Sequence, residues 1–132
     1  MRAVDTNIIL RLVTGDDPRQ EAIARDLISR GTVMVPLTVV LESEWVLRSF
    51  YKYSRTEIAV ALTRLSYHPG LYFPNAAGVR WALDRYVAGA DFDDVIHLLA
   101  SSAANAALLV TFDGDMPEEV GSAMPVPIDV LV

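Results

Sequence analysis

Residues 2–13, which read RAVDTNIILRLV, indicate the fold class because they join a short strand to a short helix. Arg2 to Val4 predicts a brief strand that ends at Asp5, and Ile8 to Val13 predicts the helix that follows. The same alternation continues along the chain. Further strands are predicted at residues 32–35, 71–73, 108–112 and 126–130. Such alternation predicts an α/β fold, a three-layer α/β/α sandwich with a central parallel sheet of four or five strands.

Capping residues mark the predicted helix starts. Asp17 to Gln20 supplies an N-cap, a Pro at the first helical position and a Gln at the third, for a helix that Gly31 can close. Ser54 and Glu57 have the spacing of a capping box. The other helices are predicted at residues 38–51, from a cap at Asn75 to residue 87, and from a cap at Asp91 to residue 107.

Length and composition favour one ordinary folded domain. The chain has 132 residues, of which 52% are hydrophobic, so we expect a single domain over residues 1–132. The absence of cysteine excludes a disulfide scaffold, a thiolate zinc site and a cysteine nucleophile. Asp5 interrupts the only segment placed like a signal peptide, and no run of ~20 apolar residues occurs. We therefore expect a cytoplasmic protein without a membrane span.

Charge is distributed unevenly along the chain. Lys and Arg number 11 against 17 Asp and Glu, a formal charge of −6, which disfavours a protein that binds duplex DNA through a broadly basic surface. All the basic residues lie in residues 1–85, whereas residues 86–132 hold eight acids and no Lys or Arg. This asymmetry predicts two differently charged faces of one domain.

Two acids directly follow predicted strands. Asp5 comes after the first strand and Asp113 after the strand that ends at Phe112. Ligands of parallel sheets bind beyond the carboxyl ends of the strands, which favours a functional role. An Asp in this position also commonly caps the next helix, so each residue alone has two interpretations.

Two glutamates on the helix at residues 38–51 differ in their surroundings. Glu44 has Arg48 four residues later, which predicts a solvated ion pair. Glu42 has no basic partner and shares a half-apolar face with Trp45. A carboxylate on such a face needs compensation, which a cation or contact with water at the edge of the core can supply.

Three acids gather at the start of the helix that follows Ala90. Capping explains Asp91 and Asp93 without any chemistry, because acids at a helix start favour the helix dipole. Asp94 lies one turn after Asp91, so both can point to the same space in front of the helix. His97 is interpreted as a structural side chain on an Ala- and Leu-rich helix.

Four acidic blocks, taken in order, resemble those of PIN domains. They are Val4 to Ile8, Glu42 three residues before Trp45, Ala90 to Ile96, and Thr111 to Asp113. The resemblance spans nearly the whole chain and is closest to the VapC-type toxins of bacterial toxin–antitoxin pairs.

The resemblance implies one acidic pocket that binds Mg²⁺ or Mn²⁺. Its metal ligands and catalytic residues would be Asp5, Glu42, Asp94 and Asp113. Asp93 is the alternative to Asp94, and Asp115 the alternative to Asp113. The resemblance also implies a set of residues that contact these ligands rather than the metal. They are Thr6, Asn7, Asp91, Thr111 and Asp115.

The implied activity is a Mg²⁺-dependent endoribonuclease, in which metal-activated water hydrolyses a phosphodiester and leaves a 3′-hydroxyl and a 5′-phosphate. Structured RNA such as tRNA is a common substrate class in the family. The implied partners are a VapB-type antitoxin and a second copy of the chain, bound through residues 45–53. Basic side chains suited to contact with the RNA phosphates are Arg11, Arg48, Lys52 and Arg55. Surface solubility explains these residues equally well.

Other enzymes with acids at strand ends fit less well. A response-regulator domain needs a basic residue after a late strand, and none occurs beyond Arg85. A haloacid-dehalogenase phosphatase needs a second Asp where Asn7 stands, and the glycine motifs of nucleotide-binding loops are absent. The remaining alternative is a non-catalytic interaction module whose acidic pocket accepts a basic residue from a partner protein.

Overall fold

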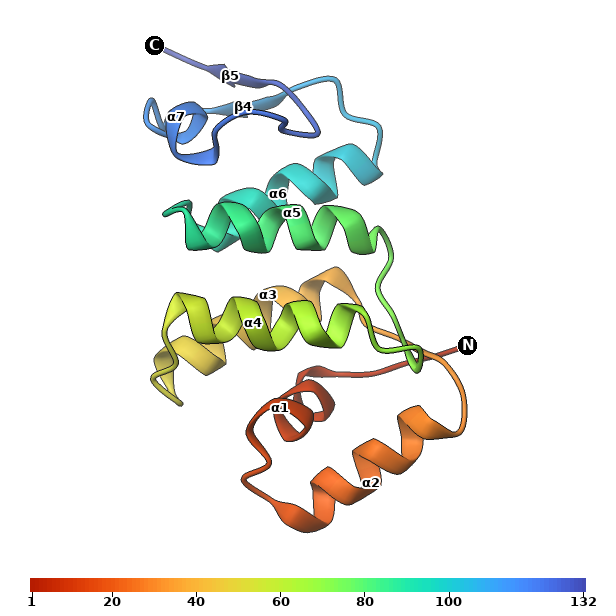
Figure 1. The fold of residues 1–132 in the computed structure, drawn as a ribbon. Helices are drawn as coiled ribbons and strands as arrows, with labels where there is room; N and C mark the ends of the chain where they lie inside the picture. Colours follow the sequence, from red (N-terminus) through yellow and green to blue (C-terminus); the bar gives the residue numbers. More distant parts are fainter. The chain divides into compact units, whose positions relative to one another are not determined.

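Parallel strands alternate with helices along the chain, as Figure 1 shows. The computed structural model describes residues 1–132 and divides into two compact units. Unit 1 is Met1–Ala76 and unit 2 is Ala77–Val132. The predicted α/β class is confirmed, with five short strands that all pair in parallel, three in one sheet and two in another. A single central sheet of four or five strands stays a prediction.

Unit 1 contains a three-stranded sheet in the order β1-β2-β3. Arg2 pairs with Val33 and Val33 with Leu71, so the central strand is β2. Because parallel neighbours cannot be joined by a tight hairpin, helices connect each strand to the next. The elements are β1 (Arg2–Ala3), α1 (Thr6–Thr14), α2 (Pro18–Ser29), β2 (Val33–Met34), α3 (Leu37–Ser49), α4 (Arg55–Ser66) and β3 (Leu71–Tyr72).

The two predicted helix caps of unit 1 are confirmed, whereas α1 begins at Thr6 and not at Ile8. The Asp17 carboxylate accepts a hydrogen bond from the Gln20 N–H at 3.0 Å, with Pro18 beginning α2. Both bonds of the capping box are present: the Glu57 N–H donates to Ser54 Oγ at 3.1 Å, and the Ser54 N–H donates to Glu57 Oε1 at 2.9 Å. Donors that have no partner within the helix are thereby satisfied.

Polar contacts tie α1 to its neighbours in unit 1. The Arg11 guanidinium donates to Asp16, to Gln20 Oε1 at 2.8 Å and to the Tyr51 hydroxyl at 3.3 Å. The Tyr51 hydroxyl in turn donates to Asp16 at 2.7 Å. These contacts hold together α1, the start of α2 and the segment after α3.

Unit 2 contains a two-stranded parallel sheet and the helices beside it. The Tyr86 and Phe92 rings meet edge to face, 5.1 Å apart, and Val95, Leu98 and Val120 are fully buried. The elements are α5 (Ala76–Val87), α6 (Phe92–Ala103), β4 (Leu109–Thr111), α7 (Met116–Val120) and β5 (Ile128–Val130).

Two predictions about unit 2 were wrong. Helix α6 ends at Ala103, not at residue 107, because Asn105 has a φ of 59°, which is not helical. Helix α7 was not predicted at all.

The single domain over residues 1–132 stays a prediction. None of the helices combines the length and the apolar character that a membrane span requires.

Replacing Ser54 by Ala should destabilise the protein by about 1 kcal/mol, because the Glu57 N–H loses its acceptor at the start of α4. Chemical denaturation measures the loss. Thr56→Ala, in the same first turn at an exposed position, is the matched control and should leave stability nearly unchanged. Equal effects of the two substitutions would contradict a role for the capping box.

Candidate metal centre

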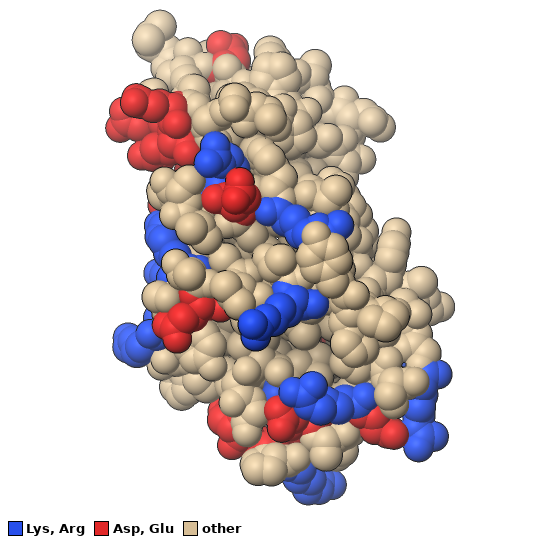
Figure 2. Space-filling view, viewed as in Figure 1, with Lys and Arg blue, Asp and Glu red and all other residues tan.

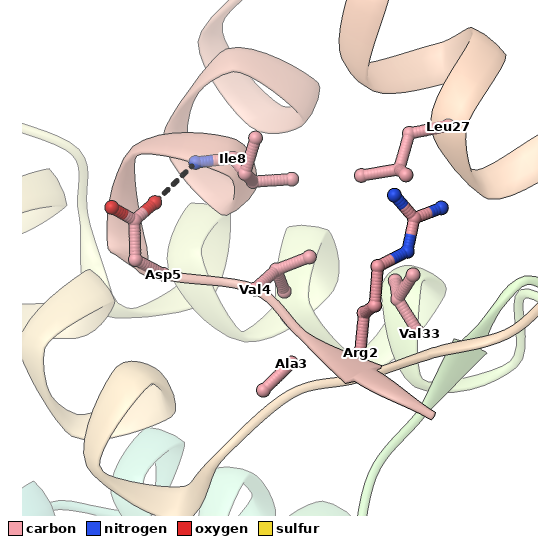
Figure 3. A pocket seen from close by; sticks show the side chains of 7 residues that line it. All are labelled: Arg2, Ala3, Val4, Asp5, Ile8, Leu27 and Val33. Atoms are coloured by element: carbon pink, nitrogen blue, oxygen red, sulfur yellow. Dashed lines mark hydrogen bonds between the residues drawn. The ribbon is translucent and has the colours of Figure 1, made fainter.

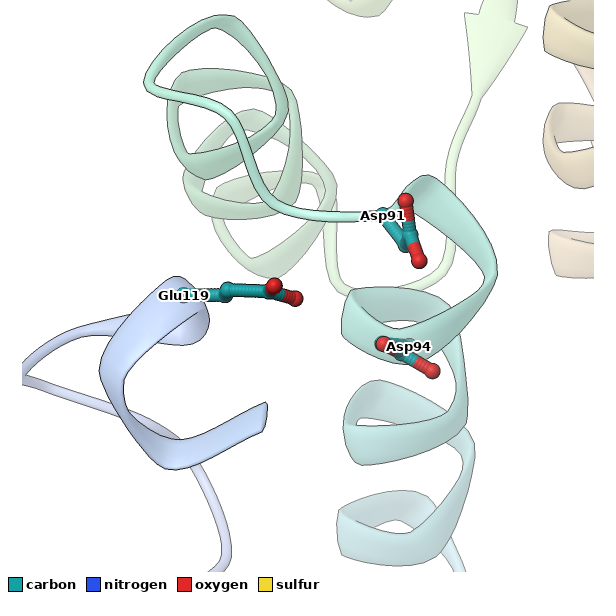
Figure 4. A group of neighbouring side chains, drawn as sticks. All are labelled: Asp91, Asp94 and Glu119. Carbon is teal, nitrogen blue, oxygen red and sulfur yellow. The ribbon is translucent and has the colours of Figure 1, made fainter. Parts of the chain in front are cut away.

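Three carboxylates from two helices of unit 2 come together at one point. Asp91, Asp94 and Glu119 each offer an oxygen, and these oxygens all lie within 4.8 Å of one another. Figure 4 shows Glu119 on α7 pointing across to the first turn of α6, where Asp91 and Asp94 lie. Asp94 is half-buried, whereas Asp91 and Glu119 are exposed. Figure 2 shows acidic side chains gathered on the surface where Figure 1 labels α7.

The start of α6 leaves the Asp91 carboxylate available. Asp91 occupies the N-cap position, and its carbonyl accepts the first helical bond from the Val95 N–H at 3.3 Å. The predicted N-cap position of Asp91 is confirmed, but its side chain makes no capping hydrogen bond. Because residues three apart share a helix face, Asp94 lies beside it.

Glu119 was not among the predicted site residues because α7 was missed. The signals for this helix are nevertheless present in the sequence. Asp115 stands at the N-cap position, Pro117 lies in the first turn, and Gly121 follows the last residue of the helix. Recognition of this five-residue helix would have added Glu119 to the candidate acids.

The cluster is electrostatically strained without a cation. Partial burial raises the pKa of Asp94, and the neighbouring charges of Asp93, Asp91 and Asp113 raise it further, while His97 opposes the shift. The pKa of Glu119 is also raised, first by desolvation and then by negative charges that include Asp113 and Asp91. Like charges in one site disfavour ionisation, and a bound cation removes that cost.

The donor set suits a hard divalent ion. All three groups are carboxylates, and Mg²⁺ and Mn²⁺ are bound by oxygen ligands. Mg²⁺ is commonly held by one or two carboxylates and retains several waters. The cluster therefore fits a divalent ion that keeps coordination positions free for water.

The end of β4 forms the turn that leads into α7. The Asp113 N–H donates to Thr111 Oγ1, and the Asp115 N–H donates to Asp113 Oδ1, both at 3.0 Å. Asp113 thus shapes the segment that carries Glu119, and its charge acts on both Asp94 and Glu119. Direct metal binding by Asp113 or Asp115 stays a prediction.

Asp5 lies in unit 1 as the N-cap of α1, where its carboxylate accepts from the Ile8 N–H at 3.4 Å. It borders a hollow of about 390 Å³, into which Arg2 also projects (Figure 3), and a second of about 290 Å³ that Asn7 borders. Thr6, beside it, is buried. Asp5 therefore faces open space even though it caps a helix.

Of the two glutamates of α3, Glu44 differs from what was predicted. Glu44 is only 3% exposed and accepts from Arg48 Nε at 2.6 Å, so the predicted pair forms but its carboxylate is not solvated. The reason is that residues 40, 44 and 47 share the buried face of α3. Glu42 is on the exposed side with Trp45. The convergence of Asp5 and Glu42 with Asp94 and Asp113 stays a prediction.

Asp94→Asn should raise the metal-free melting temperature at pH 7. Because the pKa of Asp94 is raised in the folded protein, ionisation of this side chain destabilises the fold. The loss of stability is absent at pH values below the pKa of Asp94 in the unfolded chain. It is complete at pH values above the pKa in the folded protein. The gain should therefore vanish at about pH 3, below the ordinary Asp pKa. Thermal melts across this range, with and without Mg²⁺, measure it.

In the same melts, Mg²⁺ should raise the melting temperature of the unmodified protein more than that of Asp94→Asn, since a ligand that binds the folded state stabilises it. Asp84→Asn, at an exposed position of unit 2, is the charge-matched control. A gain from Asp94→Asn that persisted unchanged at pH 3 would contradict the electrostatic explanation.

Comparison with known proteins identifies the family. The model of the PIN domain matches residues 2–120, a range that includes the whole Asp91, Asp94 and Glu119 cluster as well as Asp5 and Glu42. No curated protein and no solved structure matches the chain. Since the family model covers far more than half of the residues, the chain belongs to the PIN domain family.

Proposed function

We propose that this protein is a metal-dependent endoribonuclease. The observation that carries the proposal is the meeting of three carboxylates within 4.8 Å in a chain of the PIN family, whose members are typically metal-dependent nucleases. RNA is the proposed substrate, and Mg²⁺ or Mn²⁺ the proposed cofactor.

Asp91, Asp94 and Glu119 would hold the ion in this proposal. Bound there, a divalent ion supplies an activated water as nucleophile and neutralises charge on the phosphate. The carboxylates of the chain must lose their protons to bind it, and the raised pKa values of Asp94 and Glu119 make protons their competitors. Metal affinity is therefore expected to rise with pH until both groups are ionised.

We further propose that the protein is the toxin of a type II toxin–antitoxin pair, with a VapB-type antitoxin and a cytoplasmic RNA such as tRNA as partners. The likeness of its acidic blocks to VapC-type toxins supports this. Lys52 is the exposed side chain best suited to phosphate, alongside the half-buried Arg55. Arg48 is exposed, but its Nε already donates to Glu44. Arg11 is left out because Asp16, Gln20 and Tyr51 already engage its guanidinium.

Incubation of RNA with the purified protein and Mg²⁺ should produce internal cleavage, and EDTA should abolish it. Asp94→Asn should lower the cleavage rate by at least ~100-fold. Loss of a residue that only orients a metal ligand can already cost that much, and Asp94 is a proposed ligand itself. Asp84→Asn removes the same charge from an exposed position of unit 2 and should retain activity. Gel analysis of 5′-labelled RNA gives the rates.

The outcome also separates catalysis from the alternative function. Cleavage that persists in EDTA or in Asp94→Asn would overturn the metal-centre proposal. Absence of cleavage and of Mn²⁺ binding, together with binding of an arginine-containing partner peptide, would favour the interaction module instead.

A homodimer through residues 45–53 is proposed as well. Trp45 is 58% exposed and Phe50 is 74% exposed, which leaves large apolar side chains on one segment without cover. Trp45→Asp should convert the dimer to a monomer in light scattering, whereas Val60→Asp, at another exposed apolar position of unit 1, should not. An unmodified protein that is monomeric at tens of micromolar would contradict this interface.

A further inference from the structure

Arg85 contacts the end of α7 without making a hydrogen bond there. It lies in the last turn of α5, its Nε is buried and has no hydrogen-bond partner, and its guanidinium lies against Gly121. A Cβ atom added at residue 121 would stand only 2.7 Å from Nη1 of Arg85. The guanidinium therefore occupies the space that any other residue at 121 would need.

Gly121 directly follows α7, and its backbone suits only glycine. Its φ of 79° and ψ of −158° fall in a region that other residues essentially do not adopt. Its N–H donates to the Pro117 carbonyl at 3.1 Å, which closes the helix two residues after Glu119. Arg85 thus fixes the segment whose last turn carries Glu119, and a cation at a helix carboxyl end is favourable.

The backbone of Arg85 contacts the segment that leads into α6 and carries Asp91. Its carbonyl accepts a hydrogen bond at 3.0 Å from the N–H of Ala90, the residue before Asp91. One residue therefore touches both segments that supply carboxylates: the entry to α6 through its carbonyl, and the end of α7 through its guanidinium.

We propose that Arg85 is a positioning residue that sets Glu119 against Asp91 and Asp94, an inference that rests on the proposed metal centre. As a cation that only donates hydrogen bonds, Arg85 cannot itself bind the metal. It acts by packing against Gly121, so that the Glu119 carboxylate stays close to those of Asp91 and Asp94.

Two roles for Arg85 predict opposite effects on metal affinity. If it acted only through its charge, its removal would leave the acidic cluster more negative and strengthen cation binding. If it positions α7, its removal frees Glu119 to move and weakens cation binding. The direction of the change therefore distinguishes the two roles.

The test is Mn²⁺ titration calorimetry on Arg85→Met, which removes the charge and retains a long apolar side chain. We expect affinity to fall ~10-fold, the lower end of the range for residues that orient metal ligands. Arg85→Lys should show a similar fall, because lysine keeps the charge but lacks the planar guanidinium. Arg64→Met, at an exposed position of unit 1, is the charge-matched control and should bind Mn²⁺ normally.

Hydrogen exchange without metal tests the same inference independently of the proposed function. In Arg85→Met, the Gly121 amide should exchange faster while the Ala90 amide, bonded to the retained carbonyl, stays protected. If Arg85→Met does not fold, Arg85→Lys gives the same test, because it removes the planar guanidinium and leaves residue 121 unchanged. Unchanged exchange at Gly121, or Mn²⁺ affinity that stays equal or rises, would overturn the inference; an unmodified protein that binds no Mn²⁺ would overturn the metal centre alone.

Discussion

Repulsion among carboxylates is the constraint on which unit 2 depends. Asp94 is partly withdrawn from water and faces the charges of Asp91, Asp93 and Asp113, and each of these raises its pKa. A fold that places such groups together loses stability, and it retains them only if another role favours them. Folding without metal therefore carries an electrostatic cost at this site, which a bound cation would relieve; such a cost is common where function needs a strained arrangement.

Much of the fold follows from local sequence signals. The capping box of Ser54 and Glu57 and the Asp17 cap were predicted correctly because their hydrogen bonds join residues three apart and depend on nothing distant. The alternation of helices and strands was predictable for the same reason. The burial of Glu44 was not, because spacing to Arg48 reveals a pair but does not reveal which face of α3 turns inward.

The candidate site was harder to predict than the fold. Asp91 and Asp94 share one helix turn, so their proximity could be deduced from spacing. Glu119 lies 25 residues after Asp94 in sequence, on a helix too short for a periodic apolar pattern. Its position depends on the turn that Thr111 and Asp113 form and on the packing of Arg85 against Gly121, and no local rule predicts that packing.

The pairing of the buried Glu44 with the exposed Arg48 has a consequence for how mutational scans of this protein are interpreted. An alanine at position 44 would remove a buried side chain that accepts from Arg48 Nε, and it would leave a cavity on the core face of α3. Such a variant would lose activity together with soluble protein, and it would resemble a catalytic mutant in any assay that does not measure folding. Position 44 would thus score as functionally important through the stability of unit 1, whereas Glu42, two residues earlier, is exposed and takes no part in the core.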